Sequence, residues 1–169
     1  MPSRQGSPRK ERSILQSESY RTWRVRLYAA ADWDEWRRMR STFWPGQTLE
    51  EMEAWLERGR ETPPRAAVIV AGGEPGQPLC GFAEVGVRSY AEGCWLGPAA
   101  YLEGWWVEPA LRGRGVGRAL VREVEAWARE NGHREMGSDT ALDNVASQEA
   151  HRALGFEEVE RAVLYRKAL

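Results

Sequence analysis

The stretch EPALRGRGVGRALVREVEAWARENG, residues 108–132, joins a proline, a glycine-rich turn and a long amphipathic helix. Apolar residues recur at helical spacing from Val116 to Asn131, and Gly132 is a typical helix stop. The N-terminus of such a helix presents unpaired backbone N–H groups and the positive end of the helix dipole. Glycines let the backbone approach a pyrophosphate closely, and arginines add positive charge around it. We therefore predict a phosphate-binding turn made of Arg112, Gly113, Arg114, Gly115, Val116, Gly117 and Arg118.

The spacing Arg112-x-x-Gly115-x-Gly117 separates this turn from better-known phosphate-binding motifs. It is not a P-loop, because no Lys-Ser/Thr pair follows the last glycine. It is not a convincing Rossmann fingerprint either, since four expected strands precede it rather than one. An ordinary helix start with a solvated basic surface remains the alternative interpretation.

The rest of the chain alternates between period-two and helical hydrophobic patterns. In the first strand Trp23, Val25 and Leu27 are expected to face inward, and Asp32 is expected to cap the helix that follows. The expected elements are strands over 22–30, 66–73, 79–90, 99–107 and 133–140, helices over 32–43, 48–59, 116–131 and 144–154, and a pair of short strands or one bent strand over 156–169. The order β-αα-βββ-α-β-α-β predicts an α/β protein. Residues 21–169 are expected to form one domain, and residues 1–20 a disordered or loosely attached tail.

Composition limits the functions that this chain is expected to have. Its 169 residues carry 24 Lys plus Arg against 25 Asp plus Glu, for a formal charge of -1, so no overall charge favours nucleic acid or an acidic membrane. Cys80 and Cys94 are too far apart for a CxxC metal clip, and we expect two free thiols in a reducing cytoplasm. No apolar run reaches the ~18 residues of a membrane span.

Several separated segments resemble a known family. VEPALRGRGVGRAL resembles the R/Q-x-x-G-x-G/A pyrophosphate motif of the GNAT N-acetyltransferases, and the order of elements is also theirs. The segments FWPG, YLEGWWVEP, GSDTALDN, SQEAHRALGFEEVER and LYRKAL are similar to the aminoglycoside 6′-N-acetyltransferases. The resemblance implies the GNAT fold, a central mixed but mostly antiparallel sheet splayed after strand 4 and flanked by about four helices. It also implies acetyl-CoA as cosubstrate and no metal.

The resemblance implies roles for residues around the splayed strand. Trp105, Trp106 and Val107 are expected to line the edge that pairs with the pantetheine arm, where a backbone N–H polarises the thioester carbonyl. Plain core packing is the alternative for the two tryptophan side chains. Asn144, at the start of the last helix, is expected to bind coenzyme A.

Two residues are candidates for proton transfer. Glu103 lies in an otherwise apolar strand, where a carboxylate is costly to place, and the family implies that it contacts the acceptor amine and takes its proton directly or through water. His151 stands seven residues after Asn144, where many GNAT enzymes carry the tyrosine that protonates the thiolate. His151 is the candidate acid, with a contact to coenzyme A or a local capping role as alternatives. Tyr165 is a second hydroxyl considered for this role, with strand packing as its alternative.

Aminoglycosides carry several ammonium groups, so their site is expected to gather carboxylates and aromatic surfaces. The expected substrate-binding residues are Trp44, Tyr90, Glu103, Asp139 and Glu160. Each also has an ordinary explanation, as helix-end packing, an exposed loop ring or a solvated charge.

The function expected from the resemblance is acetylation of an aminoglycoside antibiotic at its 6′-amine, conferring resistance. One alternative is a GNAT enzyme acting on another amine, such as a protein N-terminus, a lysine or a polyamine. Another is a non-catalytic module that binds acyl-CoA. The expected partners are a polycationic amine and a second copy of the chain, since related 6′-acetyltransferases are commonly homodimers, with neither nucleic acid nor membrane involved.

Overall fold

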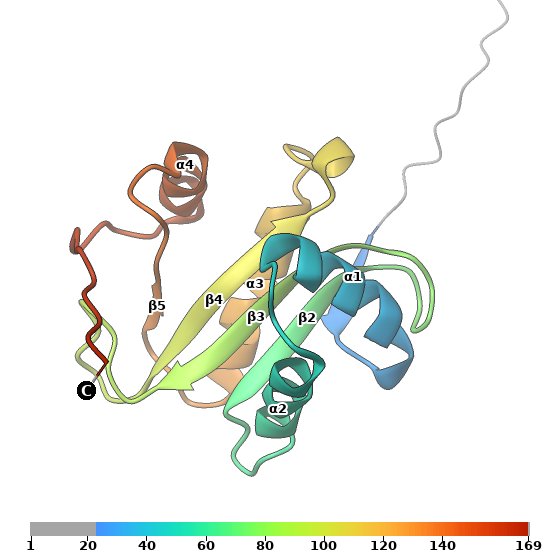
Figure 1. The fold of residues 1–169 in the computed structure, drawn as a ribbon, viewed down its shortest axis with the longest axis horizontal. Helices are drawn as coiled ribbons and strands as arrows, with labels where there is room; N and C mark the ends of the chain where they lie inside the picture. The colour runs from blue at the N-terminus through green and yellow to red at the C-terminus, as the bar shows by residue number, and fades with distance from the viewer. Residues whose placement is uncertain (1–22, 169) are drawn as a thin grey trace, which may run out of the picture.

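A five-stranded sheet with helices on both faces organises the protein, as the computed structural model describes it over residues 23–168 (Figure 1). The expected tail over residues 1–20 lies outside the described residues. The strands are β1 (Arg24–Leu27), β2 (Ala66–Gly72), β3 (Leu79–Arg88), β4 (Ala99–Val107) and β5 (Met136–Ser138). The helices are α1 (Trp33–Phe43), α2 (Leu49–Gly59), α3 (Val116–Glu130) and α4 (Val145–Leu154), with short 3-10 turns η1 (Ala30–Asp32) and η2 (Pro109–Leu111).

The sheet is mixed, and the strands stand in chain order. β1 to β4 pair antiparallel, whereas β5 runs parallel to β4. The parallel pairing joins only Ala100 to Leu102 with Met136 to Ser138, so the β5 side of β4 has no strand partner beyond Leu102 among residues 23–168. The predicted fold class, with its splay after the fourth strand, is confirmed.

Two apolar clusters bury the two faces of the sheet. Val116, Leu120 and Val124 of α3 pack against one face, together with Ile69 and Leu102. Trp36, Met39 and Met52 from α1 and α2 cover the other face. Helix α2 begins with the predicted capping box, in which Thr48 accepts from the Glu51 backbone and the Glu51 carboxylate accepts from the Thr48 backbone. None of the helices in residues 23–168 is long and apolar enough to cross a membrane.

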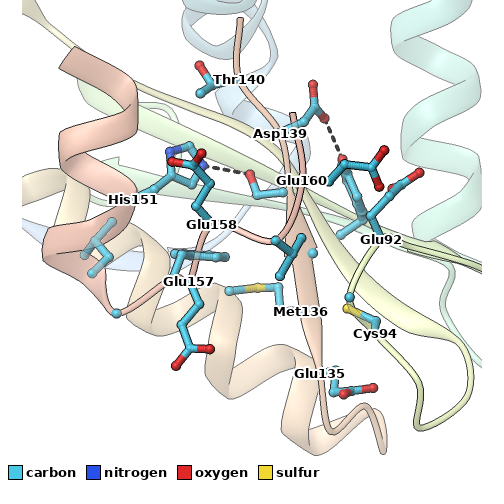
Figure 2. A pocket seen from close by; sticks show the side chains of 18 of the residues that line it. Glu92, Cys94, Glu135, Met136, Asp139, Thr140, His151, Glu157, Glu158 and Glu160 are labelled. Atoms are coloured by element: carbon cyan, nitrogen blue, oxygen red, sulfur yellow. Dashed lines mark hydrogen bonds between the residues drawn. The ribbon is translucent and has the colours of Figure 1, made fainter. Parts of the chain in front are cut away.

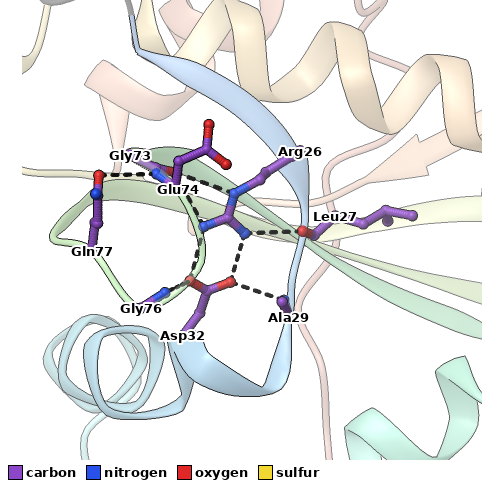
Figure 3. A network of polar contacts seen from close by, with 8 residues as sticks. All are labelled: Arg26, Leu27, Ala29, Asp32, Gly73, Glu74, Gly76 and Gln77. Carbon is purple, nitrogen blue, oxygen red and sulfur yellow. Dashed lines mark hydrogen bonds and ion pairs between the residues drawn. The ribbon is translucent and has the colours of Figure 1, made fainter.

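A buried ion pair fixes the start of the described chain (Figure 3). Arg26 donates to both carboxylate oxygens of Asp32, at 2.6 and 2.9 Å, and the backbone N–H groups of Ala29 and Gly76 donate to the same carboxylate. The prediction that the Asp32 side chain caps α1 is therefore wrong. Asp32 occupies the N-cap position, but its side chain makes no hydrogen bond to the helix. Leu27 is also 55% exposed rather than inward, because it ends an edge strand.

The predicted strand over residues 156–169 is absent from the described part of that range. Residues 157–168 form neither helix nor strand and are exposed throughout. They run beside the loop that follows β3, with Val159 against Gly93 (Figure 1). Alternation of apolar and polar residues suits a strand only if another strand offers its hydrogen-bonding edge. No described strand lies alongside this segment, which explains the difference.

Candidate active site

A β-bulge in β4 sets the position of Glu103. Glu84 of β3 pairs with Gly104 and Val85 pairs with Leu102, so Glu103 is the extra residue between them. Glu103 and the next residue consequently face the same side of the sheet. A Cβ on Gly86 would meet the Glu103 carboxylate at 3.0 Å, and one on Gly104 would meet the Phe43 and Trp44 rings. The bulge thus turns a carboxylate toward the α1 and α2 face, immediately before the splayed part of β4.

Glu103 accepts two hydrogen bonds from the guanidinium of Arg88, the last residue of β3. Arg88 Nε lies 3.2 Å from one carboxylate oxygen and a terminal nitrogen lies 2.5 Å from the other. The Arg88 guanidinium carbon stands 3.3 Å from the centre of the Tyr101 ring. Burial alone lowers the pKa of Arg88, but the hydrogen bond and charge of Glu103 outweigh it and raise that pKa above its ordinary value.

Tyr101 connects this pair to Asp139, which directly follows β5. The Tyr101 hydroxyl donates to Asp139 Oδ1 at 2.6 Å. Burial and this bond raise the pKa of Tyr101 well above its ordinary value, so the ring stays a neutral donor. Glu103, Arg88, Tyr101 and Asp139 therefore form one chain of polar contacts across three strands.

A cavity of about 1060 Å³ opens beside this chain, between β5, α4 and the C-terminal segment. Figure 2 shows Asp139, Glu92 and Glu160 around it, and its wall also contains Arg88, Tyr101 and His151. Of the predicted substrate-binding acids, Asp139 and Glu160 thus lie on one cavity. Glu103 is not part of its wall and reaches it through Arg88.

The predicted phosphate-binding turn lies on the opposite side of the splay, at the start of α3. Gly113 and Gly115 have φ angles of +73° and +90°, and a Cβ on either would meet nothing within 4 Å. Apart from the neighbouring residues of the turn itself, no described residue covers the space into which a side chain at either glycine would point. Arg114 and Arg118 are exposed, and Arg112 donates to the Val107 carbonyl at 3.0 Å. This arrangement fits a pyrophosphate.

Trp105 and His151 occupy the gap between the open edge of β4 and helix α4. Their rings meet edge to face, with centroids 4.7 Å apart. His151 Nε2 lies 2.9 Å from Ser138 Oγ, and the Ser138 hydroxyl donates its hydrogen to the Leu102 carbonyl at the last paired position of β4. The other ring nitrogen lies 2.7 Å from the Ser147 carbonyl and so carries the proton of that bond. Ser138 ties the histidine to the point where the strands separate.

The two adjacent tryptophans of β4 face opposite sides. Trp105 Nε1 lies 3.2 Å from the position of a Cβ on Gly117, on the α3 side. Val107 lies on the same side, in the α3 cluster. Trp106 is 8% exposed and packs among the α1 and α2 residues. Of the two side chains, only that of Trp105 borders the gap.

The remaining predicted residues stand apart from one another. Asn144 is the N-cap of α4, and its side chain accepts from the Ser147 N–H at 3.1 Å. Trp44 packs on Phe43 and Phe82 near the bulge, with Arg40 over its ring. The remaining two are exposed and outside the cavity wall, namely Tyr90 and Tyr165.

Three residues of the candidate site are not predicted from the sequence, namely Arg88, Tyr101 and Ser138. Arg88 ends a strand, where an arginine usually serves as a solvated charge. Tyr101 reads as an ordinary strand aromatic, and Ser138 as part of a short polar segment. A paired register of β3 and β4 is needed to bring Arg88 opposite the bulge. No sequence signal in a single chain supplies that register.

A comparison with known protein families identifies the family of this chain. The sequence model of the Acetyltransferase (GNAT) family matches residues 30–156. The chain belongs to this family. Its relatives include the aminoglycoside N(6′)-acetyltransferase type 1 of Klebsiella aerogenes, which is 44% identical over 86% of this chain and 96% of its own length. The protein of the same name from Salmonella typhimurium is 41% identical, over 79% of this chain and 91% of its own.

Solved structures of GNAT acetyltransferases agree with the fold. AAC(6′)-Iy in complex with the bisubstrate analogue CoA-S-monomethyl-acetylneamine superposes with a TM-score of 0.78 and 35% sequence identity. The alignment covers 87% of this chain and 99% of that one. AAC(6′)-Iy in complex with CoA gives the same TM-score at 36% identity. In the described part of this GNAT chain, residues 23–168, no group of three or more His, Cys, Asp and Glu side chains is placed to hold a metal ion.

Proposed function

We propose that this GNAT protein transfers an acetyl group from acetyl-CoA to the 6′-amine of aminoglycoside antibiotics and so confers resistance to them. The single observation that supports the proposal most is the bulge at Glu103, a carboxylate in β4 next to the part of that strand that β5 does not pair with. The names of relatives 34–44% identical over most of the chain support the same substrate class.

The proposed cosubstrate site runs from the turn at Gly113 and Gly115 along the open edge of β4. When bound there, acetyl-CoA supplies an acetyl thioester. Backbone N–H groups before α3 and the charges of Arg114 and Arg118 hold its pyrophosphate. Trp105 lines the gap beyond Leu102, where a β4 backbone N–H stabilises negative charge on the carbonyl oxygen. Asn144 contributes at the start of α4.

The proposed acceptor site uses Glu103, Asp139 and Glu160 for the ammonium groups, with Trp44 and Tyr90 as aromatic contacts. An amine attacks only as its neutral form, so Glu103 first attracts the 6′-ammonium and then accepts one proton, directly or through water. The amine nitrogen bonds to the acetyl carbon as the carbon–sulfur bond breaks, and the nitrogen releases its second proton to water. His151 is the proposed donor of the proton that the leaving thiolate takes up.

We further propose that the protein acts in the cytoplasm, where acetyl-CoA is made, as a homodimer. The C-terminal segment supports the dimer, because apolar side chains stand exposed along it at Val159, Val163, Leu164 and Tyr165. Exposed apolar groups gathered on one extended segment are typical of an interface.

Acetylation of kanamycin by the purified protein, with the acetylated nitrogen assigned by NMR, tests the proposed function. We expect transfer to the 6′-amine, with spermine and a lysine-containing basic peptide acetylated at least 100-fold less efficiently. Efficient acetylation of spermine or the peptide instead of kanamycin contradicts the proposed substrate. Binding of acetyl-CoA without transfer to any of the three amines favours the non-catalytic module.

A further inference from the structure

The position of Arg88 bears on how the acceptor site selects its substrate. An ammonium group bound by Glu103 has to lie within hydrogen-bonding distance of the carboxylate oxygens. Arg88 already lies there, at 3.2 and 2.5 Å from the two oxygens. The guanidinium covers both oxygens at once in the bidentate manner, which is the geometry that most strongly holds a carboxylate.

The same guanidinium also extends toward the second acid. It stacks on the Tyr101 ring at 3.3 Å, and the Tyr101 hydroxyl donates to Asp139. Arg88 thus bonds one of the two acids assigned to substrate ammonium groups and contacts the tyrosine that bonds the other. The Arg88 side chain is 42% exposed and Glu103 is 22% exposed, so the arginine has room to move toward solvent whereas the carboxylate is held in the sheet.

We propose that Arg88 is a built-in competitor of the substrate, a cation of the protein that occupies the ammonium position at Glu103 until an aminoglycoside displaces it. The inference rests on the proposed function, because it needs Glu103 to bind the amine. Every amine has to break the same Arg88–Glu103 bonds to bind. The affinity of every amine is therefore lowered by one common factor, and only a polycation with further contacts to Asp139 and Glu160 binds well. Abundant small monoamines are kept out.

A competitor role and a positioning role for Arg88 predict opposite effects of its removal on substrate binding. Removal of an arginine that merely positions Glu103 weakens substrate use, whereas removal of a competitor strengthens it. The variant Arg88→Gln has a similar length but no charge. We expect it to bind kanamycin about fivefold more tightly, the upper range for the loss of a partly exposed ion pair. The affinity of Arg88→Gln for the monoamine 6-amino-6-deoxyglucose should rise by the same factor.

The experiment measures Kd by calorimetry in the presence of coenzyme A, and kcat/KM with acetyl-CoA, for both amines. We expect kcat/KM to rise about fivefold through a lower KM, with the Kd of acetyl-CoA unchanged. Arg37→Gln is the matched control, because Arg37 is 46% exposed in an ion pair with Asp34 on α1 and is not part of the cavity wall. That variant should leave both amines at their wild-type affinity.

A second variant protects the test against misfolding. Arg88→Lys keeps a cation at Glu103 but loses the bidentate fork, and we expect a gain of about threefold. Equal or weaker kanamycin binding in folded Arg88→Gln or Arg88→Lys overturns the competitor role while kanamycin acetylation by the wild type still supports the function. A wild-type protein that neither binds nor acetylates an aminoglycoside overturns both.

Discussion

At the scale of single residues, Glu103 is the side chain on which the proposed chemistry depends. Gln at this position keeps the shape and accepts one bond from Arg88, but it has no negative charge and no basicity. We expect Glu103→Gln to lower kcat on the order of 100-fold, the usual effect of removing a general base. The affinity for acetyl-CoA should stay within twofold, because the phosphate-binding turn is unchanged.

The pH profile separates this role from simple binding. In the Gln variant the acidic limb of the kcat profile should disappear or move upward. A Gln variant with nearly normal kcat at pH 7 means that solvent or another residue deprotonates the amine. Glu103 is then only a binding group.

Asp139 tests recognition rather than chemistry. Asp139→Asn preserves an acceptor for the Tyr101 hydroxyl and removes only the charge. We expect the KM of kanamycin to rise about tenfold and that of acetyl-CoA to stay constant, since one ammonium contact is lost. Added salt should reproduce the effect in the wild type. Equal changes in both KM values contradict a role in recognition and point to a structural one.

The sequence identifies carboxylates better than it identifies their partners. An acid within an apolar strand is conspicuous, and Glu103 was predicted for that reason. Arg88 and Tyr101 become part of the site only through the pairing of β3 with the bulged β4. A bulge adds one residue to one strand, and periodicity within that strand does not reveal where. The partner of a predicted residue therefore has to come from the structure.

At the scale of elements, the start of α3 carries the cosubstrate prediction. Gly115 combines a φ of +90° with open space before the helix. Gly115→Asp places a negative charge where the pyrophosphate is proposed to bind. We expect the affinity for coenzyme A to fall on the order of 100-fold, from repulsion between like charges a few ångströms apart. Calorimetry measures this change in the affinity for coenzyme A.

Gly115→Asn is the matched control, because Asn has nearly the same size and bears the same backbone strain without the charge. We expect the affinity of this variant for coenzyme A to fall tenfold or less. Circular dichroism should show an unchanged fold in both variants. Coenzyme A affinity that is unchanged in folded Gly115→Asp rejects the phosphate-binding assignment.

Elements with a strong internal pattern were predicted closely, and those that depend on a neighbour were not. The sequence predicts β4 at its observed bounds and α3 to within one residue, because α3 has a clear helical period and β4 is a nearly continuous apolar run. The strand expected over residues 156–169 has the required alternation but no described strand beside it. Strand formation is a property of a pair of segments, which one segment does not encode alone.

At the scale of the whole molecule, the exposed C-terminal segment bears on assembly. Leu164 and Tyr165 are 92% and 93% exposed, which is unfavourable for large apolar side chains unless something covers them. A second copy of the chain is the proposed cover. We therefore expect sedimentation equilibrium to give twice the 19.2 kDa mass of one chain at micromolar concentration.

The variant Leu164→Asp tests whether this segment forms the contact. A charge buried in an apolar interface without a partner strongly opposes association, so we expect a monomer or at least a 100-fold weaker dimer. Leu49→Asp is the matched control: Leu49 is 53% exposed at the first residue of α2, where an acidic side chain suits the helix dipole. Its mass should remain that of a dimer.

A wild type that sediments as a monomer excludes the proposed homodimer. A dimer that persists in Leu164→Asp means that the interface lies on another surface.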